Sequence, residues 1–157
     1  MSSFSWCAMN RRSVRQAIAG FAVLLILASC DPGPRVQWTK YTGESFDAAL
    51  RSGRPTVVDC YAAWCRPCMM LKHETFTDPR VVAALGSFNR LRADLSFRES
   101  EYARAVSKKH RIQGLPTMIF FDEGGREIPR RVWGFMTADQ FLEFLESLKE
   151  KKGVPPH

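Results

Sequence analysis

The sequence predicts an α/β fold in which a central mixed sheet is flanked by helices. Two observations lead to this prediction. Strand-like apolar runs alternate with helical segments along most of the chain, which is the pattern of parallel crossovers. The last two strand-like runs instead face each other across Glu123-Gly124-Gly125, a hairpin turn, so the sheet also needs an antiparallel pair. The length of 157 residues suits one domain.

Composition and charge exclude some functions and leave others open. The formal net charge is +7, and three of the positive charges, at Arg11, Arg12 and Arg15, lie in the N-terminal segment. The remainder is mildly basic, which indicates a solvated surface or a face for anionic lipid headgroups or an acidic partner. No basic helix or interleaved aromatic motif is present, so nucleic acid is not an expected partner.

Residues 1–29 are typical of a bacterial lipoprotein signal peptide. A positive stretch precedes an apolar run at 17–28, which is too short for the ~20 residues of a usual transmembrane helix. The sequence Leu27-Ala28-Ser29-Cys30 resembles a lipobox, which implies cleavage before Cys30 and lipidation of that residue. Asp31 resembles an inner-membrane retention signal, so we expect attachment to the inner membrane, facing the periplasm. The alternatives are a soluble secreted protein and an uncleaved anchor helix.

The next elements are expected in a fixed order. Residues 30–35 form the lipidated cysteine with a short Pro- and Gly-rich tether. A domain then extends over 36–150, with a short first strand at 36–38 and a helix at 44–51 whose apolar residues share one face. The run at 56–61 is nearly continuous in apolar residues, which favours a central strand covered on both faces.

The second half continues the alternation of helices and strands. An Asp-Pro pair and a Thr-x-x-Gln capping box mark the starts of two of its helices. The tail at 151–157 is polar. The expected elements are helices from Cys65 to about Glu74 and from Pro79 to Gly86, a strand at 88–95, a helix at 99–110, strands at 118–121 and 127–132, and a last helix that begins at Thr137.

Cys65 and Cys68 form a redox dithiol candidate at the point where a strand becomes a helix. The unpaired N–H groups and the positive end of the helix dipole stabilise a thiolate there, and we expect the sulfur of Cys65 to be exposed. Pro67 suits the first helical turn, where its missing N–H costs little. Arg66 adds positive charge that lowers the thiol pKa. Trp64 is expected to shield the dithiol and to pack locally, and it can also take part in substrate binding.

Asp59 is a carboxylate inside an apolar strand. Such a group is costly to bury unless it is paired or neutral, and a raised pKa would let it accept the proton of the buried thiol. The alternative is a polar residue at a solvated edge. Cys60 points to the other face and is expected to be a small core residue. Without a second Cys-x-x-Cys, a four-ligand zinc site is not expected.

Several segments together resemble the thioredoxin superfamily. They are Val58 to Cys68, Thr75 to Pro79, Gly114-Leu115-Pro116-Thr117 with the strand that follows, and Gly134-Phe135-Met136. The likeness extends over about 36–149 and is strongest to the C-terminal periplasmic domain of the thiol:disulfide interchange protein DsbD. It implies a thioredoxin-like sandwich, a cis bond at Pro116 against the dithiol, and backbone groups of Leu115 that pair with an extended substrate. Asp59 occupies the position of the family's general base.

The resemblance implies a periplasm-facing thiol:disulfide oxidoreductase that reduces protein disulfides without a cofactor. Reduced Cys65 attacks a substrate disulfide, and Cys68 then resolves the mixed disulfide with help from Asp59. The oxidising periplasm requires an electron supply, which a membrane partner of the interchange type would provide. Lys72 departs from the family, which has an acidic residue there, so no acid role is carried over to it.

Other functions remain open at this point. Arg66 favours the dithiol form and therefore an oxidase or isomerase. A Cu(I)-handling module would use Cys65, Cys68 and perhaps His73, because soft ligands select Cu(I). A lipoprotein adaptor would use the fold only as a binding surface, and its function would not depend on Cys65.

Overall fold

The computed structural model describes residues 33–150. The predicted signal peptide, the predicted lipidation of Cys30 and the predicted tail at 151–157 lie outside the described residues, and so they stay predictions. Within the described range no helix is both long enough and apolar enough to cross a membrane.

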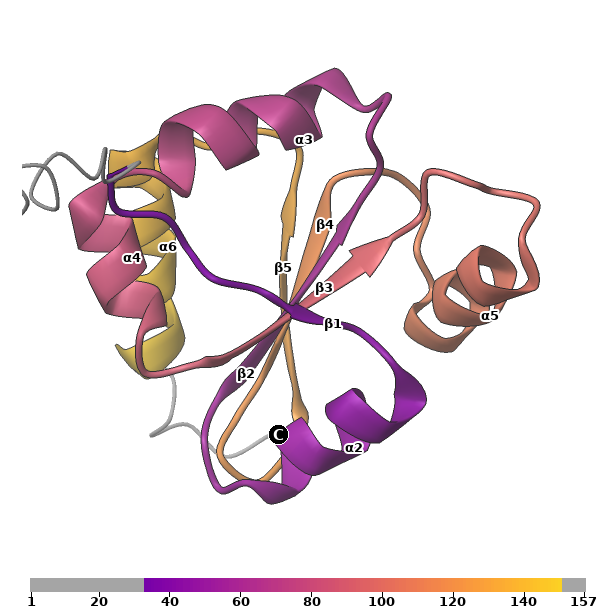
Figure 1. Ribbon diagram of the computed structural model, residues 1–157. Helices are drawn as coiled ribbons and strands as arrows, with labels where there is room; N and C mark the ends of the chain where they lie inside the picture. Colours follow the sequence, from indigo (N-terminus) through magenta and orange to yellow (C-terminus); the bar gives the residue numbers. More distant parts are fainter. Residues whose placement is uncertain (1–32, 151–157) are drawn as a thin grey trace, which may run out of the picture. The chain divides into compact units, whose positions relative to one another are not determined.

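Five strands form one mixed sheet, with β2 at its centre (Figure 1). The order across the sheet is β1-β3-β2-β4-β5. The first three strands of this order are parallel, whereas β4 is antiparallel to both of its neighbours. The strands are β1 Thr39–Lys40, β2 Thr56–Tyr61, β3 Asn89–Asp94, β4 Thr117–Phe121 and β5 Glu127–Trp133. This topology confirms the predicted α/β fold with a mixed sheet.

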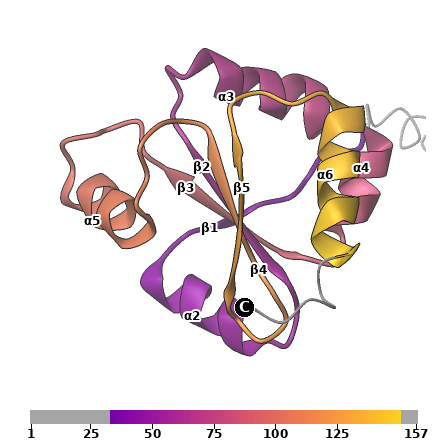
Figure 2. The ribbon, with the colours of Figure 1, turned by 180° about the vertical axis from the view of Figure 1, so that it is seen from behind.

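Helices cover both faces of the sheet, as the two opposite views show (Figures 1 and 2). One face carries α3, η1, α4 and α6, and the other carries α2 and α5. Their bounds are α2 Gly43–Arg51, α3 Arg66–Met70, the π-helix η1 Leu71–Thr75, α4 Pro79–Leu85, α5 Glu101–His110 and α6 Ala138–Glu150.

Each face of the sheet has its own apolar core, and β2 contributes to both. Val57 packs in the cluster that includes Leu71 and Phe141, while Val58 packs in the cluster that includes Phe46. Successive side chains of a strand point to opposite faces, so a strand between two cores must be apolar on both. Each such buried side chain contributes about 1.5–3 kcal/mol by leaving water. The prediction of a central, doubly covered strand is confirmed.

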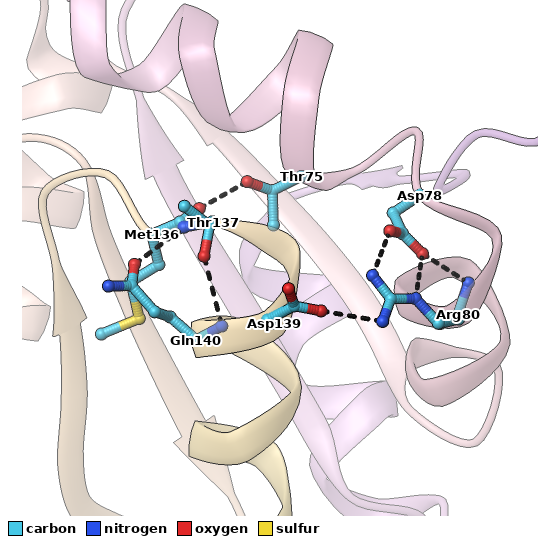
Figure 3. Close-up of polar contacts among 7 residues, drawn as sticks. All are labelled: Thr75, Asp78, Arg80, Met136, Thr137, Asp139 and Gln140. Atoms are coloured by element: carbon cyan, nitrogen blue, oxygen red, sulfur yellow. Dashed lines mark hydrogen bonds and ion pairs between the residues drawn. The ribbon is translucent and has the colours of Figure 1, made fainter.

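Polar contacts fasten the end of η1 to the start of α6 (Figure 3). The buried Thr75 donates its hydroxyl hydrogen bond to the Met136 carbonyl at 2.5 Å. Thr137 and Gln140 form the predicted capping box, in which each side chain accepts from the other residue's backbone N–H. The helix that follows the dithiol is therefore tied at its far end to the last helix of the domain.

Arg80 links α4 to α6 at the surface (Figure 3). Its guanidinium lies 2.8 Å from carboxylate oxygens of both Asp78, the N-cap of α4, and Asp139 of α6. Exposed ion pairs of this kind contribute little, about 0–1 kcal/mol. The pair orients α4 against α6 more than it stabilises the domain.

Two elements differ from the sequence-based predictions. The first strand was expected at 36–38, but it lies at Thr39–Lys40 and both of its residues are exposed. Val36 is buried instead, and its N–H donates to the Phe76 carbonyl at 3.0 Å. The helix expected from Cys65 to Glu74 changes to a π-helix at Leu71. There the Phe76 N–H reaches back five residues to the Leu71 carbonyl at 2.8 Å.

Candidate active site

The two cysteines lie at the junction between β2 and α3. Cys65 is the N-cap of α3, and its sulfur accepts a hydrogen bond from the Cys68 N–H at 3.3 Å. Cys65 and Cys68 are joined in a disulfide, with their Cα atoms 5.3 Å apart. Pro67 occupies the first turn, where its missing N–H leaves no intrahelical bond unmade. A thiolate at Cys65 would have the same donor pointing at it, which favours the charged form.

The disulfide is covered more than the sequence suggested. Cys65 is only 5% exposed and Cys68 only 1%, so the expected exposure of the Cys65 sulfur is wrong for this state. Ala62 and Leu115 pack against the two cysteines. Trp64 is 52% exposed and donates its ring N–H to the Ser96 carbonyl at 2.9 Å, so its local packing is against the loop after β3.

The proline loop lies beside the disulfide. The Leu115-Pro116 peptide bond is cis, as expected from the resemblance, and Leu115 contacts the cysteine cluster. The Pro116 carbonyl accepts from the Gly134 N–H at 3.3 Å, which holds the loop against the end of β5. The half-buried Leu115 is placed where it could meet a partner chain at the dithiol, and that role stays a prediction.

Asp59 is buried in β2 with 1% of its surface exposed, so the alternative of a solvated edge is wrong. Alternation along the strand puts it on the face of Val57, which is the face that carries α3 and η1. Burial raises the pKa of its carboxyl group to about 6, and the positive charge of Arg92 opposes that rise. A raised pKa makes the carboxylate a better proton acceptor than an ordinary Asp.

Arg92 is the residue that sequence reasoning missed. It pairs with Asp59 across β2 and β3, and its Nε lies 2.9 Å from Asp59 Oδ2. Both atoms are buried, so the contact is a close ion pair that is shielded from water. The Arg92 guanidinium stacks on the ring of Tyr61 at 4.1 Å and near that of Trp38 at 5.6 Å. Only the register of β3 against β2 could have indicated this partner.

A cavity of about 310 Å³ opens beside this ion pair. It is lined by Trp38, Lys40, Tyr61, Arg92, Asp94 and Tyr102. The side chain of Arg92 is 16% exposed, whereas that of Asp59 is 1% exposed. Arg92 therefore stands between the buried carboxylate and water, and it limits how readily solvent stabilises the charge of Asp59.

The remaining singled-out side chains near the dithiol are at the surface. Arg66, Lys72 and His73 are exposed, and Met69 and Met70 are half-buried. In the part of the chain that the structure describes, no group of three or more His, Cys, Asp or Glu residues is placed to hold a metal ion. His73 therefore does not complete a metal-binding cluster of these residue types with the two cysteines.

Comparison with known proteins places these features in a family. Residues 42–149 match the family described as "Thioredoxin-like domain". The chain belongs to this family. Two relatives of the thioredoxin-like domain, from Pectobacterium atrosepticum and Ralstonia nicotianae, are both named "Thiol:disulfide interchange protein DsbD". They are 42% and 40% identical over 63% and 71% of this chain. The matched segments make up only 17% and 18% of those relatives.

Solved structures agree with the fold of the thioredoxin-like domain. The oxidised C-terminal domain of DsbD from Neisseria meningitidis is 25% identical, with a TM-score of 0.56. That match covers 66% of this chain and 89% of the other. A thioredoxin from Thermus thermophilus is 21% identical, with a TM-score of 0.61. That match covers 76% of this chain and 91% of the thioredoxin, and it supports the fold alone.

Proposed function

We propose that this thioredoxin-like domain reduces disulfide bonds in proteins. The observation that carries the proposal is the Cys65–Cys68 disulfide at the start of α3, with the Cys68 N–H aimed at the Cys65 sulfur. This placement favours Cys65 as the attacking thiolate and leaves the more buried Cys68 to resolve the intermediate. The relatives' printed name, thiol:disulfide interchange protein, supports the same chemistry.

The reaction proceeds in two exchanges. The Cys65 thiolate attacks one sulfur of the substrate disulfide, the S–S bond breaks, and the departing thiolate takes a proton from solvent. Cys68 then gives its proton to Asp59 and attacks Cys65, and the second substrate sulfur leaves as a thiolate that takes a proton from solvent. Two electrons pass from the dithiol to the substrate, and the domain is left as the disulfide seen here. Asp59, with a pKa of about 6, returns its proton to water.

Electrons must come from elsewhere for a second turnover. We propose that a membrane protein of the transmembrane thiol:disulfide interchange type re-reduces the domain, because the periplasm does not supply reductant. Lipidation of Cys30 would hold the domain at the periplasmic face of the inner membrane, close to such a donor. Disulfide-containing proteins are then its substrates.

One observation favours the opposite direction of electron flow. Arg66 follows Cys65 directly and is exposed, so its charge stabilises the thiolate and with it the reduced form. A dithiol stabilised in this way is a stronger oxidant. A disulfide oxidase is therefore the second candidate function.

The reduction potential of the Cys65–Cys68 pair decides between these functions. The full-length protein is equilibrated in glutathione buffers, and the oxidised fraction is read from the mass of the alkylated peptide that contains both cysteines. A potential near about −270 mV supports a reductase, and a potential near about −120 mV would assign an oxidase instead. Cys68→Ser is the control, because it should trap the mixed disulfide without turnover.

A further inference from the structure

Three large apolar side chains are exposed in residues 33–150, and all three lie at the dithiol end of the sheet. Phe97 is 81% exposed, Trp64 is 52% exposed and Trp133 is 51% exposed. Trp64 belongs to the loop before α3, Phe97 to the loop between β3 and α5, and Trp133 ends β5. These loops and strand ends meet at the side of the sheet where α3 begins (Figure 1). Gathered exposed apolar groups of this kind mark interaction sites.

The loop that carries Phe97 is hydrogen-bonded to the loop before α3. Ser96 accepts the Ala63 N–H at 2.8 Å through its hydroxyl and the Trp64 ring N–H at 2.9 Å through its carbonyl. The Ser96 backbone N–H in turn donates to Asp94 at 2.9 Å. The backbone that carries Phe97 is therefore held at a set position relative to the loop before α3, which lowers the entropy lost by this loop when a partner binds.

Arg98 gives this surface a positive charge. Its guanidinium lies 4.2 Å from the centre of the Trp64 ring, so the charge is held directly over the exposed indole. The neighbouring acid, Glu99, is directed to Arg104 at 3.8 Å. Arg66, beside Cys65, adds a second exposed positive charge at the same end.

Trp133 lies at the same end of the sheet, two strands away from β2. It pairs with Thr117, the residue after the cis proline, on the strand next to β2. Phe97 follows β3, which lies on the opposite side of β2. The two aromatic residues thus lie on opposite sides of β2, and alternation along β5 directs the Trp133 side chain to the face that carries α2 and α5. A protein that offers its disulfide to Cys65 would contact this surface.

We propose that Phe97, Arg98 and Trp64 form a docking surface for one kind of partner. That partner is a protein whose exchanging disulfide lies next to apolar side chains and carboxylates. Phe97 supplies an exposed apolar anchor, and Arg98 with Arg66 attracts the carboxylates. This inference rests on the proposed function, because it names the substrate class of the same dithiol.

The test compares three synthetic peptides of equal length, each with one internal disulfide. The disulfide is flanked by Asp and Leu in the first, by Lys and Leu in the second, and by Ser on both sides in the third. We expect the full-length, reduced protein to reduce the Asp/Leu peptide about tenfold faster, by kcat/KM, than the Lys/Leu peptide. The small neutral 2-hydroxyethyl disulfide serves as a substrate that is too small to reach the surface.

Two variants assign the preference to the surface. Arg98→Gln should reduce the Asp-over-Lys preference about threefold, whereas Arg126→Gln, an exposed arginine of the β4–β5 hairpin, should leave it unchanged. Phe97→Ala should slow both Leu-flanked peptides about tenfold, and Phe97→Leu should restore most of the rate. Neither change should alter the rate with 2-hydroxyethyl disulfide, since both side chains are exposed and their loss does not disturb the core.

The outcomes separate this inference from the function on which it rests. Equal rates for the three peptides, or equal slowing of 2-hydroxyethyl disulfide by Phe97→Ala, would overturn the docking surface and leave the reductase intact. Failure of the wild type to reduce any of the four disulfides would overturn the proposed function, and the docking surface with it.

Discussion

Asp59 and His110 are both buried and titratable, but they are held in different ways. His110 packs against the rings of Tyr41, Phe46 and Phe121, and its Nε2 lies 2.7 Å from the Tyr41 hydroxyl. Its carbonyl accepts from Arg131 at 2.8 Å. Asp59, on the other face of the sheet, is held by an ion pair with Arg92 at 2.9 Å.

The difference separates a group that stabilises the fold from one that is available for chemistry. Burial shifts both pKa values toward the neutral form, raising that of Asp59 to about 6 and lowering that of His110 to about 4. His110 is therefore neutral near pH 7, and its ring nitrogen is hydrogen-bonded to the Tyr41 hydroxyl. Asp59, with a pKa raised to about 6, lies on the sheet face that carries α3, and this agrees with the role of proton acceptor proposed for it.

The largest expected effect is on catalysis, from Asp59→Asn. The amide cannot accept the Cys68 proton, so resolution of the mixed disulfide should slow about 100-fold at pH 7. Single-turnover release of a labelled substrate from Cys65 measures this step. His110→Ala is the matched control, and an unchanged release rate in Asp59→Asn would remove the carboxylate from the mechanism.

His110→Ala should instead destabilise the fold, because it leaves a cavity among three rings and a buried Tyr41 hydroxyl without its partner. We expect the free energy of unfolding in urea to fall by about 3 kcal/mol. The disulfide-exchange rate of the folded fraction should not change. A large loss of that rate would mean that the two regions are coupled.

Asp59 and His110 should make the free energy of unfolding change with pH in opposite directions. The raised pKa of Asp59 means that its contribution to stability decreases as the pH rises from about 4 to about 6. The lowered pKa of His110 means that stability is lost as the pH falls from 6.5 toward 4. The two slopes oppose each other in the wild type.

Removing one group should therefore reveal the slope of the other. In Asp59→Asn, stability should fall on the order of 1–2 kcal/mol between pH 7 and pH 4.5, measured by urea unfolding at each pH. In His110→Phe it should rise over the same interval. Parallel curves for the two variants would contradict the assigned pKa directions.

The smallest effect is expected for Tyr41→Phe. The change removes only the hydroxyl that meets His110, which should cost about 1 kcal/mol of unfolding free energy. Thermal unfolding checks it, with Tyr102→Phe as the comparison, because that hydroxyl donates to the Tyr41 backbone carbonyl and not to the His110 ring.

Most of the fold follows from local patterns, and the exceptions have physical causes. Strand β2 and the capping box at Thr137 were predicted because apolar runs and cap residues are local signals. Strand β1 was misplaced because its two residues are exposed and carry no apolar alternation. The π-helix depends on where Phe76 and Thr75 are buried, and this is settled by α6 and not by the local sequence.

The candidate site was predictable where residues are neighbours in sequence and not where they meet across strands. The Cys65 and Cys68 spacing and the apolar run around Asp59 indicated the dithiol and the buried carboxylate. Arg92 was missed because its pairing with Asp59 depends on the register of two strands. Phe97 was missed because an aromatic side chain in a sequence indicates core, and only the structure shows it in solvent.

Cys60 completes the description of residues 33–150, where it is the one free cysteine. It is fully buried in the core opposite Asp59, and burial raises the pKa of its thiol to about 12. An alkylating reagent can therefore reach it only when the domain opens. The rate at which Cys60 is labelled therefore measures how often the domain unfolds globally. It reports on the stability of the domain in membranes or lysates, where denaturants cannot be used.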